Sequence, residues 1–170
     1  MSRAGGNPIV PDYAGPNVRG IVPALLGPTS WSDTMPDWMP DAVREADAVV
    51  LYVLDGLGWD QLQTHAELAP TLTSMQGRSI HTVAPTTTAT ALSSITTGLT
   101  PGEHGLVGYR MLLGGEVMNV LRWAVDTRQV RRSQPPSSVQ PFQPVLGERV
   151  PVVAQGELQD SAFSEAHLRG

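Results

Sequence analysis

The chain has 170 residues, enough for one domain with a substantial core, and 41% of them are hydrophobic. Its formal net charge of -5 argues against a surface that binds nucleic-acid polymers or anionic membranes. All eleven basic residues are arginine and cysteine is absent. Schiff-base lysines, P-loop lysines, cysteine nucleophiles and thiolate metal sites are therefore excluded.

The N-terminal part, residues 1–40, is rich in proline and glycine and predicts an irregular arm. One short helical turn is expected over residues 21–26, because Gly27-Pro28 is a stop signal. Aromatic and methionine side chains are expected to pin the arm to the rest of the chain: Trp31, Met35, Trp38 and Met39. No apolar run reaches the roughly 20 residues of a membrane helix. The first residues also lack the apolar core of a secretory signal, so a cytoplasmic location is the default expectation.

The body, residues 41–170, opens with a short helix up to residue 46 and then a strand over residues 48–54. Six apolar residues run here without alternation, which is typical of a strand buried on both faces. Asp55 follows at the carboxyl end, where open α/β sheets place their ligands. Two interpretations of Asp55 are open. It is a metal ligand that offsets the cost of burying a carboxylate, or an acid that caps the turn.

The middle of the chain predicts a helix from Trp59, a second strand over residues 79–84 and a further helix after residue 87. In that last helix Leu92, Ile95 and Leu99 form an apolar stripe, and Gly98 gives the stop signal. The threonines at its start have poor helical propensity, so tertiary packing has to hold it.

The second half of the sequence predicts a β-hairpin over residues 109–123 with a Gly114-Gly115 turn, and then a polar loop over residues 128–140. A helix-then-strand unit is expected over residues 145–154 and a final helix over residues 161–168. Successive strand–helix units favour the α/β fold class, with a mostly parallel sheet flanked by helices and the hairpin as an insertion.

Three threonines, Thr86 to Thr88, lie at the junction of the second strand and the following helix. A hydroxyl there faces free helix N–H groups that attract anions, and it could act as a nucleophile if a metal lowered its pKa. The alternative is an N-cap and nothing else. Because Asp55 and these threonines end consecutive predicted strands, we expect them to meet in space. His104 could ligate a metal, but it follows a helix end, so a structural role is favoured.

With Asp55-Gly56, the segment 84–90 (Ala-Pro-Thr-Thr-Thr-Ala-Thr) and the segment 97–105 (Thr-Gly-Leu-Thr-Pro-Gly-Glu-His-Gly) in order, the chain resembles the alkaline phosphatase superfamily. More closely, it is similar to the type I phosphodiesterase/nucleotide pyrophosphatase branch. The resemblance implies that Asp55 is a metal ligand and that Thr88 is both nucleophile and ligand. It also implies two divalent ions, zinc with manganese or magnesium as alternatives. A small-molecule phosphoester would pass its phosphoryl group to Thr88, and the phospho-threonine would then be hydrolysed.

The sequence departs from the family pattern at two kinds of position. Thr87 and Ala91 stand where nucleotide-cleaving relatives often carry lysine and asparagine, which removes a donor to the phosphoryl oxygens. The remaining candidate ligands lack the spacing of the family's later metal ligands: His104, Asp126, Asp160 and His167. The chain is therefore expected to be the N-terminal, incomplete part of an alkaline-phosphatase-like catalytic domain, nearly inactive without the remainder. Two alternatives stay open, a non-catalytic α/β domain that binds an anion or a partner, and a phosphomutase of the same superfamily.

Overall fold

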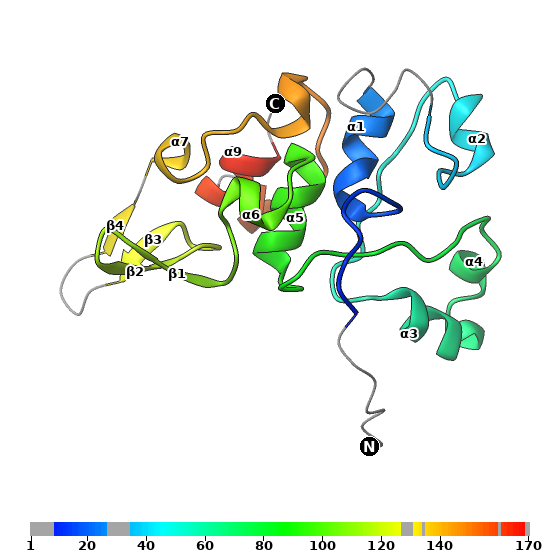
Figure 1. Cartoon of the computed structure of the whole chain (residues 1–170), viewed down its shortest axis with the longest axis horizontal. Coiled ribbons are helices and arrows are strands. Elements are labelled where there is room, and N and C mark those ends of the chain that lie inside the picture. The colour runs from blue at the N-terminus through cyan, green and yellow to red at the C-terminus, as the bar shows by residue number, and fades with distance from the viewer. Residues whose placement is uncertain (1–8, 27–34, 127–130, 134, 160, 169–170) are drawn as a thin grey trace.

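The computed structural model describes residues 9–26, 35–126, 131–133, 135–159 and 161–168 (Figure 1). Its α-helices are α1 (Ile21–Leu26), α2 (Asp41–Arg44), α3 (Trp59–Thr64), α4 (Pro70–Thr73), α5 (Thr88–Thr97), α6 (Pro101–His104), α7 (Pro136–Val139), α8 (Gly156–Gln159) and α9 (Ala162–His167). Three 3-10 helices are η1 (Val18–Gly20), η2 (Ala66–Leu68) and η3 (Pro144–Gly147). The strands are β1 (Arg110–Leu113), β2 (Glu116–Asn119), β3 (Ala124–Asp126) and β4 (Arg131–Ser133). Within the described ranges, every helix is too short or too polar to cross a bilayer.

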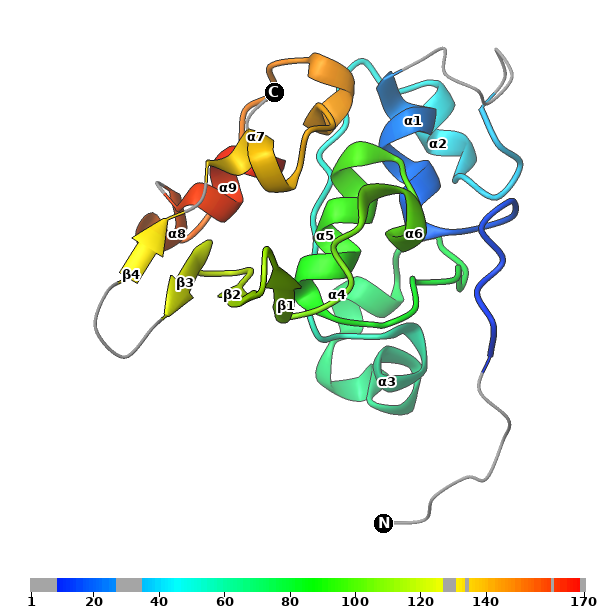
Figure 2. The same cartoon turned by 60° about the vertical axis from the view of Figure 1, so that its left-hand side comes forward.

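Helix α5 is the element around which the others are arranged, with α1, η1, α6, α9 and η3 all packed against it (Figures 1 and 2). Seven of its ten residues are buried although most of them are Thr or Ser. Their hydroxyls bond back to carbonyls one turn earlier, as Thr96 does to Leu92 O at 2.9 Å and Thr97 to Ser93 O at 2.6 Å. Tertiary packing therefore holds a helix of poor intrinsic propensity, as the sequence predicts.

The end of α5 is fixed by Gly98, which confirms the predicted stop signal. Gly98 adopts φ +74°, a left-handed conformation that favours glycine, and its N–H bonds to Ser94 O at 3.0 Å. A Cβ added at Gly98 would lie 2.6 Å from Cγ of Pro23 in α1. The glycine therefore serves both the cap and the close approach of α1 to α5.

The four strands form one antiparallel sheet in the order β1-β2-β3-β4. The predicted hairpin is confirmed: Leu113 pairs with Glu116 across Gly114 and Gly115, whose φ angles are both positive. Met118 of β2, Val125 of β3, and Val120 and Trp123 of the connection between them contribute to a core that also holds residues of α5 and α9. A second, smaller core joins Val22, Ile95 and Val145.

The predicted parallel sheet is wrong for the part of the chain that the structure describes; only the combination of helices with a β-sheet is confirmed. Residues 48–54 form no strand, and their large apolar side chains are 37–88% exposed. A strand needs a hydrogen-bonded neighbour, and none of the described residues pairs with this stretch. Residues 79–84 make only a single parallel bridge, between His81 and Asn17.

The predictions for residues 128–154 also need correction. The predicted polar loop contains β4 and α7 in its described part, since Arg131–Ser133 pairs with β3. In place of a helix followed by a strand, the structure has the short η3, and residues 150–154 carry no regular structure. As with residues 48–54, an extended apolar stretch without a paired neighbour does not form a strand.

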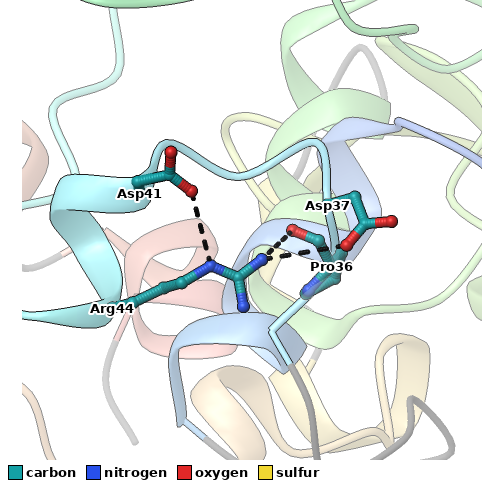
Figure 3. Close-up of polar contacts among 4 residues, drawn as sticks. All are labelled: Pro36, Asp37, Asp41 and Arg44. Atoms are coloured by element: carbon teal, nitrogen blue, oxygen red, sulfur yellow. Dashed lines mark hydrogen bonds and ion pairs between the residues drawn. The ribbon is translucent and has the colours of Figure 1, made fainter.

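The predicted short helices are confirmed at α1, α2, the start of α3 at Trp59, and α9, which Ser161 caps by accepting from Ser164 N–H at 3.1 Å. Arg44, the last residue of α2, holds the turn that precedes this helix (Figure 3). Its guanidinium bonds to Pro36 O at 3.3 Å and pairs with Asp37 and Asp41 at 4.0 and 3.8 Å. Met39 is buried, whereas Trp31 lies outside the described residues.

Candidate active site

Asp55 and Thr88 meet in the structure although they are 33 residues apart in the chain. The Thr88 hydroxyl donates a hydrogen bond to Asp55 Oδ2 at 2.8 Å. Asp55 lies in a turn closed by a hydrogen bond from Leu57 N–H to Leu54 O at 3.3 Å, and Thr88 is the first residue of α5. The expected meeting of carboxylate and hydroxyl thus occurs without the two strands that led us to expect it.

The residues just before Thr88 are held by local hydrogen bonds. The Thr86 hydroxyl donates to Val83 O at 2.9 Å, and Val83 is almost fully buried. Thr87 is the N-cap: its Oγ1 accepts from Thr90 N–H at 3.4 Å and lies 2.8 Å from Thr90 Oγ1. The neighbouring threonines are thus engaged with the helix start, and Thr88 alone turns its hydroxyl toward a carboxylate.

The two positions that depart from the family pattern supply no side-chain donor to the site. The Thr87 hydroxyl is occupied by the cap, and Ala91 has only a methyl group. The Ala91 N–H bonds within the helix, to Thr87 O at 2.8 Å. The remaining positive potential comes from the amino end of α5, where backbone N–H groups and the helix dipole favour an anion.

The electrostatics of the pair limit what it can do alone. A phosphoester that approaches Thr88 carries negative charge and would meet the Asp55 carboxylate beside the attacking hydroxyl. Like charges at this separation oppose binding. The N–H groups of α5 offset only part of that repulsion, because a helix end carries about half a positive charge. A cation between carboxylate and phosphoryl oxygens would reverse the sign of the interaction.

The donor set tests whether such a cation fits. The Asp55 carboxylate and the Thr88 hydroxyl are oxygen donors of the kind that divalent ions accept. Within the described residues, however, no three His, Asp or Glu side chains gather to hold a metal ion. Asp160 and the side chain of Asp126 lie outside the described parts. The described residues therefore do not complete a metal centre by themselves.

His104 occupies a buried structural position at the end of α6. The N–H of Leu106 donates to its Nδ1 at 3.1 Å, and its Nε2 lies 2.9 Å from Ser94 Oγ. Since Nδ1 accepts, the neutral ring carries its proton on Nε2 and donates to Ser94. Burial lowers the pKa of His104 to about 4, against the smaller raising effect of Glu103. Both ring nitrogens are thus engaged by the protein.

Sequence reasoning missed a second buried histidine, His167, which it treated only as a possible late metal ligand. His167 is fully buried; its Nε2 lies 2.8 Å from Ser93 Oγ and its Nδ1 2.9 Å from Phe163 O. It packs edge-on against Trp123, with ring centroids 5.6 Å apart. Burial lowers the pKa of His167 to about 4. Its only sequence signal was its place in the last turn of a helix, which does not reveal burial.

Comparison with known proteins adds one match. A family model described as Type I phosphodiesterase / nucleotide pyrophosphatase matches residues 49–153. The matched range contains both Asp55 and Thr88 and covers more than half of the chain. No match to this chain was found among curated proteins or among solved structures.

Proposed function

Because the chain belongs to the type I phosphodiesterase / nucleotide pyrophosphatase family of the alkaline phosphatase superfamily, we propose that it carries the nucleophile of a metal-dependent phosphoester hydrolase. The observation that supports this proposal is the 2.8 Å hydrogen bond from Thr88 to Asp55 at the amino end of α5. A hydroxyl joined to a carboxylate at the amino end of a helix supplies two of the parts that phosphoryl transfer requires, the nucleophile and backbone N–H groups that favour an anion.

The reaction then has two steps. Thr88 Oγ1 attacks phosphorus, the bond from phosphorus to the leaving oxygen breaks, and the hydroxyl proton passes through Asp55 to the leaving alkoxide. A water molecule next attacks the phospho-threonine, the bond from phosphorus to Oγ1 breaks, and one water proton restores the Thr88 hydroxyl. The dipole and the backbone N–H groups at the amino end of α5 stabilise the charge on the phosphoryl oxygens in both steps.

Two divalent ions, zinc with manganese or magnesium as alternatives, would neutralise phosphoryl charge and lower the pKa of the Thr88 hydroxyl. Asp55 and Thr88 would contribute two of the oxygen ligands. We propose that a further segment of the catalytic domain brings the others, because the described residues form no group of three candidate ligands. The exposed apolar stretch 49–54 supports this, since a surface of that kind usually marks an interface.

The substrate in this proposal is a phosphoester of a small molecule. A formal net charge of -5 disfavours a nucleic-acid polymer. The engaged Thr87 hydroxyl and the methyl group of Ala91 leave the phosphoryl oxygens without side-chain donors from these two positions. Recognition would then depend on the metal ions and on the N–H groups of α5.

Two other functions are compatible with the same features. A non-catalytic domain that binds a partner is favoured by the exposed apolar stretch 49–54. A phosphomutase of the same superfamily would use the same phospho-threonine but return the phosphoryl group to an alcohol. The products separate these cases, because a hydrolase releases inorganic phosphate and a binding domain forms no phospho-threonine.

The test measures p-nitrophenol release from bis-p-nitrophenyl phosphate, with zinc, manganese or magnesium. It uses the 170-residue chain and the protein that its full reading frame encodes. We expect almost no turnover from the 170-residue chain. In the full-frame protein, Thr88→Ala should lower kcat at least about 10³-fold, and Asp55→Asn should weaken metal binding measured by titration. Thr64→Ala is the control, because that hydroxyl bonds only to Asp60 O on α3.

Acid quenching during turnover should give a phosphorylated peptide that contains Thr88. The hydrolase proposal is wrong if Thr88→Ala retains more than about a tenth of the wild-type kcat. Metal-stimulated turnover by the 170-residue chain that Thr88→Ala abolishes would instead overturn the expectation that a further segment is required.

A further inference from the structure

We propose that Asn17, assisted by Tyr13, is a positioning residue for Thr88; this inference rests on the proposed role of Thr88 as the nucleophile. The stretch from residue 82 to residue 87, which leads into α5, has no regular secondary structure. Its place is therefore set by what it bonds to, and the N-terminal arm provides those bonds. The arm lies outside the range 49–153 that the family model matches.

The arm and the approach to Thr88 are joined first through the backbone. His81 N–H donates to Pro16 O at 2.8 Å, and Val18 N–H donates to His81 O at 2.9 Å. These two bonds form the parallel bridge between Asn17 and His81. A bridge of one residue pair gives little stability by itself, so the side chains around it matter.

Asn17 provides those side-chain contacts from a fully buried position. Its Nδ2 donates to Thr82 O and to Asp12 O, both at 3.2 Å, and its Oδ1 accepts from Arg19 N–H at 3.1 Å. A primary amide has two N–H protons and one acceptor oxygen, and here all three are used. Asn17 therefore ties the approach to Thr88, through Thr82, to the arm and to the start of η1.

Tyr13 adds a contact closer to the nucleophile. Its hydroxyl oxygen accepts from Ala84 N–H at 3.1 Å, and Ala84 is four residues before Thr88. Its own carbonyl accepts from Arg19 Nε at 2.7 Å. Tyr13 and Asn17 thus hold the approach at two successive points, residues 82 and 84.

The arm also contacts the carboxyl end of α5. Arg19 Nη1 donates to Gly98 O at 3.0 Å, and Pro23 occupies the space where a Cβ of Gly98 would lie. Figures 1 and 2 show α1 running beside α5 in both views. The arm thus bonds to the segment that precedes α5 and to Gly98 at the end of α5, and these contacts restrain the helix and the direction of the Thr88 side chain.

The test compares Asn17→Ala with a matched control, Asn119→Ala, in the 170-residue chain. Asn119 is also buried, donates to Tyr109 Oη at 2.7 Å and accepts from Arg122 N–H at 3.0 Å, but it lies in β2. Two readouts are measured by NMR. Three-bond couplings to the Thr88 γ-methyl carbon give the rotamer that aims Oγ1 at Asp55. Hydrogen exchange of the Thr90 and Ala91 amides reports the first turn of α5.

In Asn17→Ala we expect couplings that report several Thr88 rotamers in exchange. Hydrogen exchange of the Thr90 and Ala91 amides should be about tenfold faster than in Asn119→Ala, after correction for global stability. Tyr13→Phe, which removes only the hydroxyl, should change both readouts in the same direction and by less. Equal readouts in Asn17→Ala and Asn119→Ala would overturn the positioning role. Neither readout needs turnover, so a failure of the hydrolase proposal would appear separately, as unchanged activity in Thr88→Ala.

Discussion

Helix α5 and the stretch 49–54 show opposite relations between composition and burial. The helix is rich in Thr and Ser, yet seven of its ten residues are buried. The stretch has six consecutive apolar residues, and all six are exposed. The difference lies in the backbone, because a helix satisfies its own hydrogen bonds and lets buried hydroxyls bond back to its carbonyls. A strand needs a neighbour. Burial therefore follows hydrogen-bond satisfaction as much as apolarity.

The candidate active site joins these two regions. Thr88 belongs to the packed helix α5, whereas Asp55 follows the exposed stretch and is joined to α5 by its bond with Thr88. The two sides of the site should accordingly respond differently to perturbation. The position of Thr88 should change little on perturbation, because α5 is packed. The position of Asp55 should change more, because the stretch before it is exposed.

The largest expected effect is a loss of stability of the packed core in acid. Burial lowers the pKa of His104 and His167 to about 4, whereas unfolded histidines take up protons near pH 6.5. Between these values the unfolded state binds more protons, so stability is fully present above about pH 6.5 and falls as the pH drops. Each histidine should cost roughly 3 kcal/mol by pH 4. Urea unfolding at a series of pH values measures this.

The controls for the acid effect are His104→Gln and His167→Gln. Glutamine can donate and accept but does not titrate, so each variant should flatten the pH dependence by about half between pH 6.5 and pH 5. Glu103 adds to the acid loss only below that window, because the backbone hydrogen bond from Thr100 lowers its pKa from 4.5. An unchanged slope in the double variant would show that the two histidines are not responsible.

The next effect compares Trp123, in the core that α5 shares, with Trp59, which lies near the exposed stretch. Trp123 is fully buried, and its ring meets Phe163 and His167 edge-on at 6.1 and 5.6 Å. Trp123→Ala should lower the free energy of unfolding by about 3–5 kcal/mol, because it leaves a cavity in the core. Trp59, which follows the exposed stretch, is 39% exposed, and Trp59→Ala should cost about 1 kcal/mol. Similar losses in urea unfolding would contradict the distinction between the regions.

The same distinction sets how much of the structure the sequence could predict. Predictions from local signals were confirmed: the stop at Gly98, the Gly114-Gly115 turn and the final helix near residues 161–168 all depend on nearby residues. The predicted strand over residues 48–54 was wrong, because strand pairing depends on residues distant in the chain, which an apolar pattern does not specify.

The candidate site divides in the same way. The adjacency of Asp55 and Thr88 was expected and is observed. Two contacts could not be predicted: that of His167 with Ser93, and the hydrogen bond from Asn17 to Thr82 O. Each joins segments more than 60 residues apart. Sequence patterns identify which side chains can do chemistry more readily than which distant residues hold them.

A smaller difference in the free energy of unfolding is expected between alanine substitutions at two glycines. Gly98 and Gly56 both have positive φ, +74° and +80°, so alanine is strained at either position. At Gly98 the added Cβ would also meet Pro23, whereas at Gly56 nothing lies within 4 Å. We expect Gly98→Ala to cost about 3 kcal/mol and Gly56→Ala about 1 kcal/mol in thermal or urea unfolding. Equal costs would mean that α1 does not press against the end of α5.

The smallest expected effect is the sharpest test of the exposed stretch. Val50 is 88% exposed, so Val50→Thr, which keeps the shape of the side chain, should change the free energy of unfolding by less than about 0.5 kcal/mol. Val83 is 1% exposed, and Val83→Thr should cost about 1–2 kcal/mol because it buries a hydroxyl. Urea unfolding of both variants makes the comparison. A loss at Val50 as large as that at Val83 would mean that the stretch is covered in solution, and the buried strand predicted from the sequence would then be the better description.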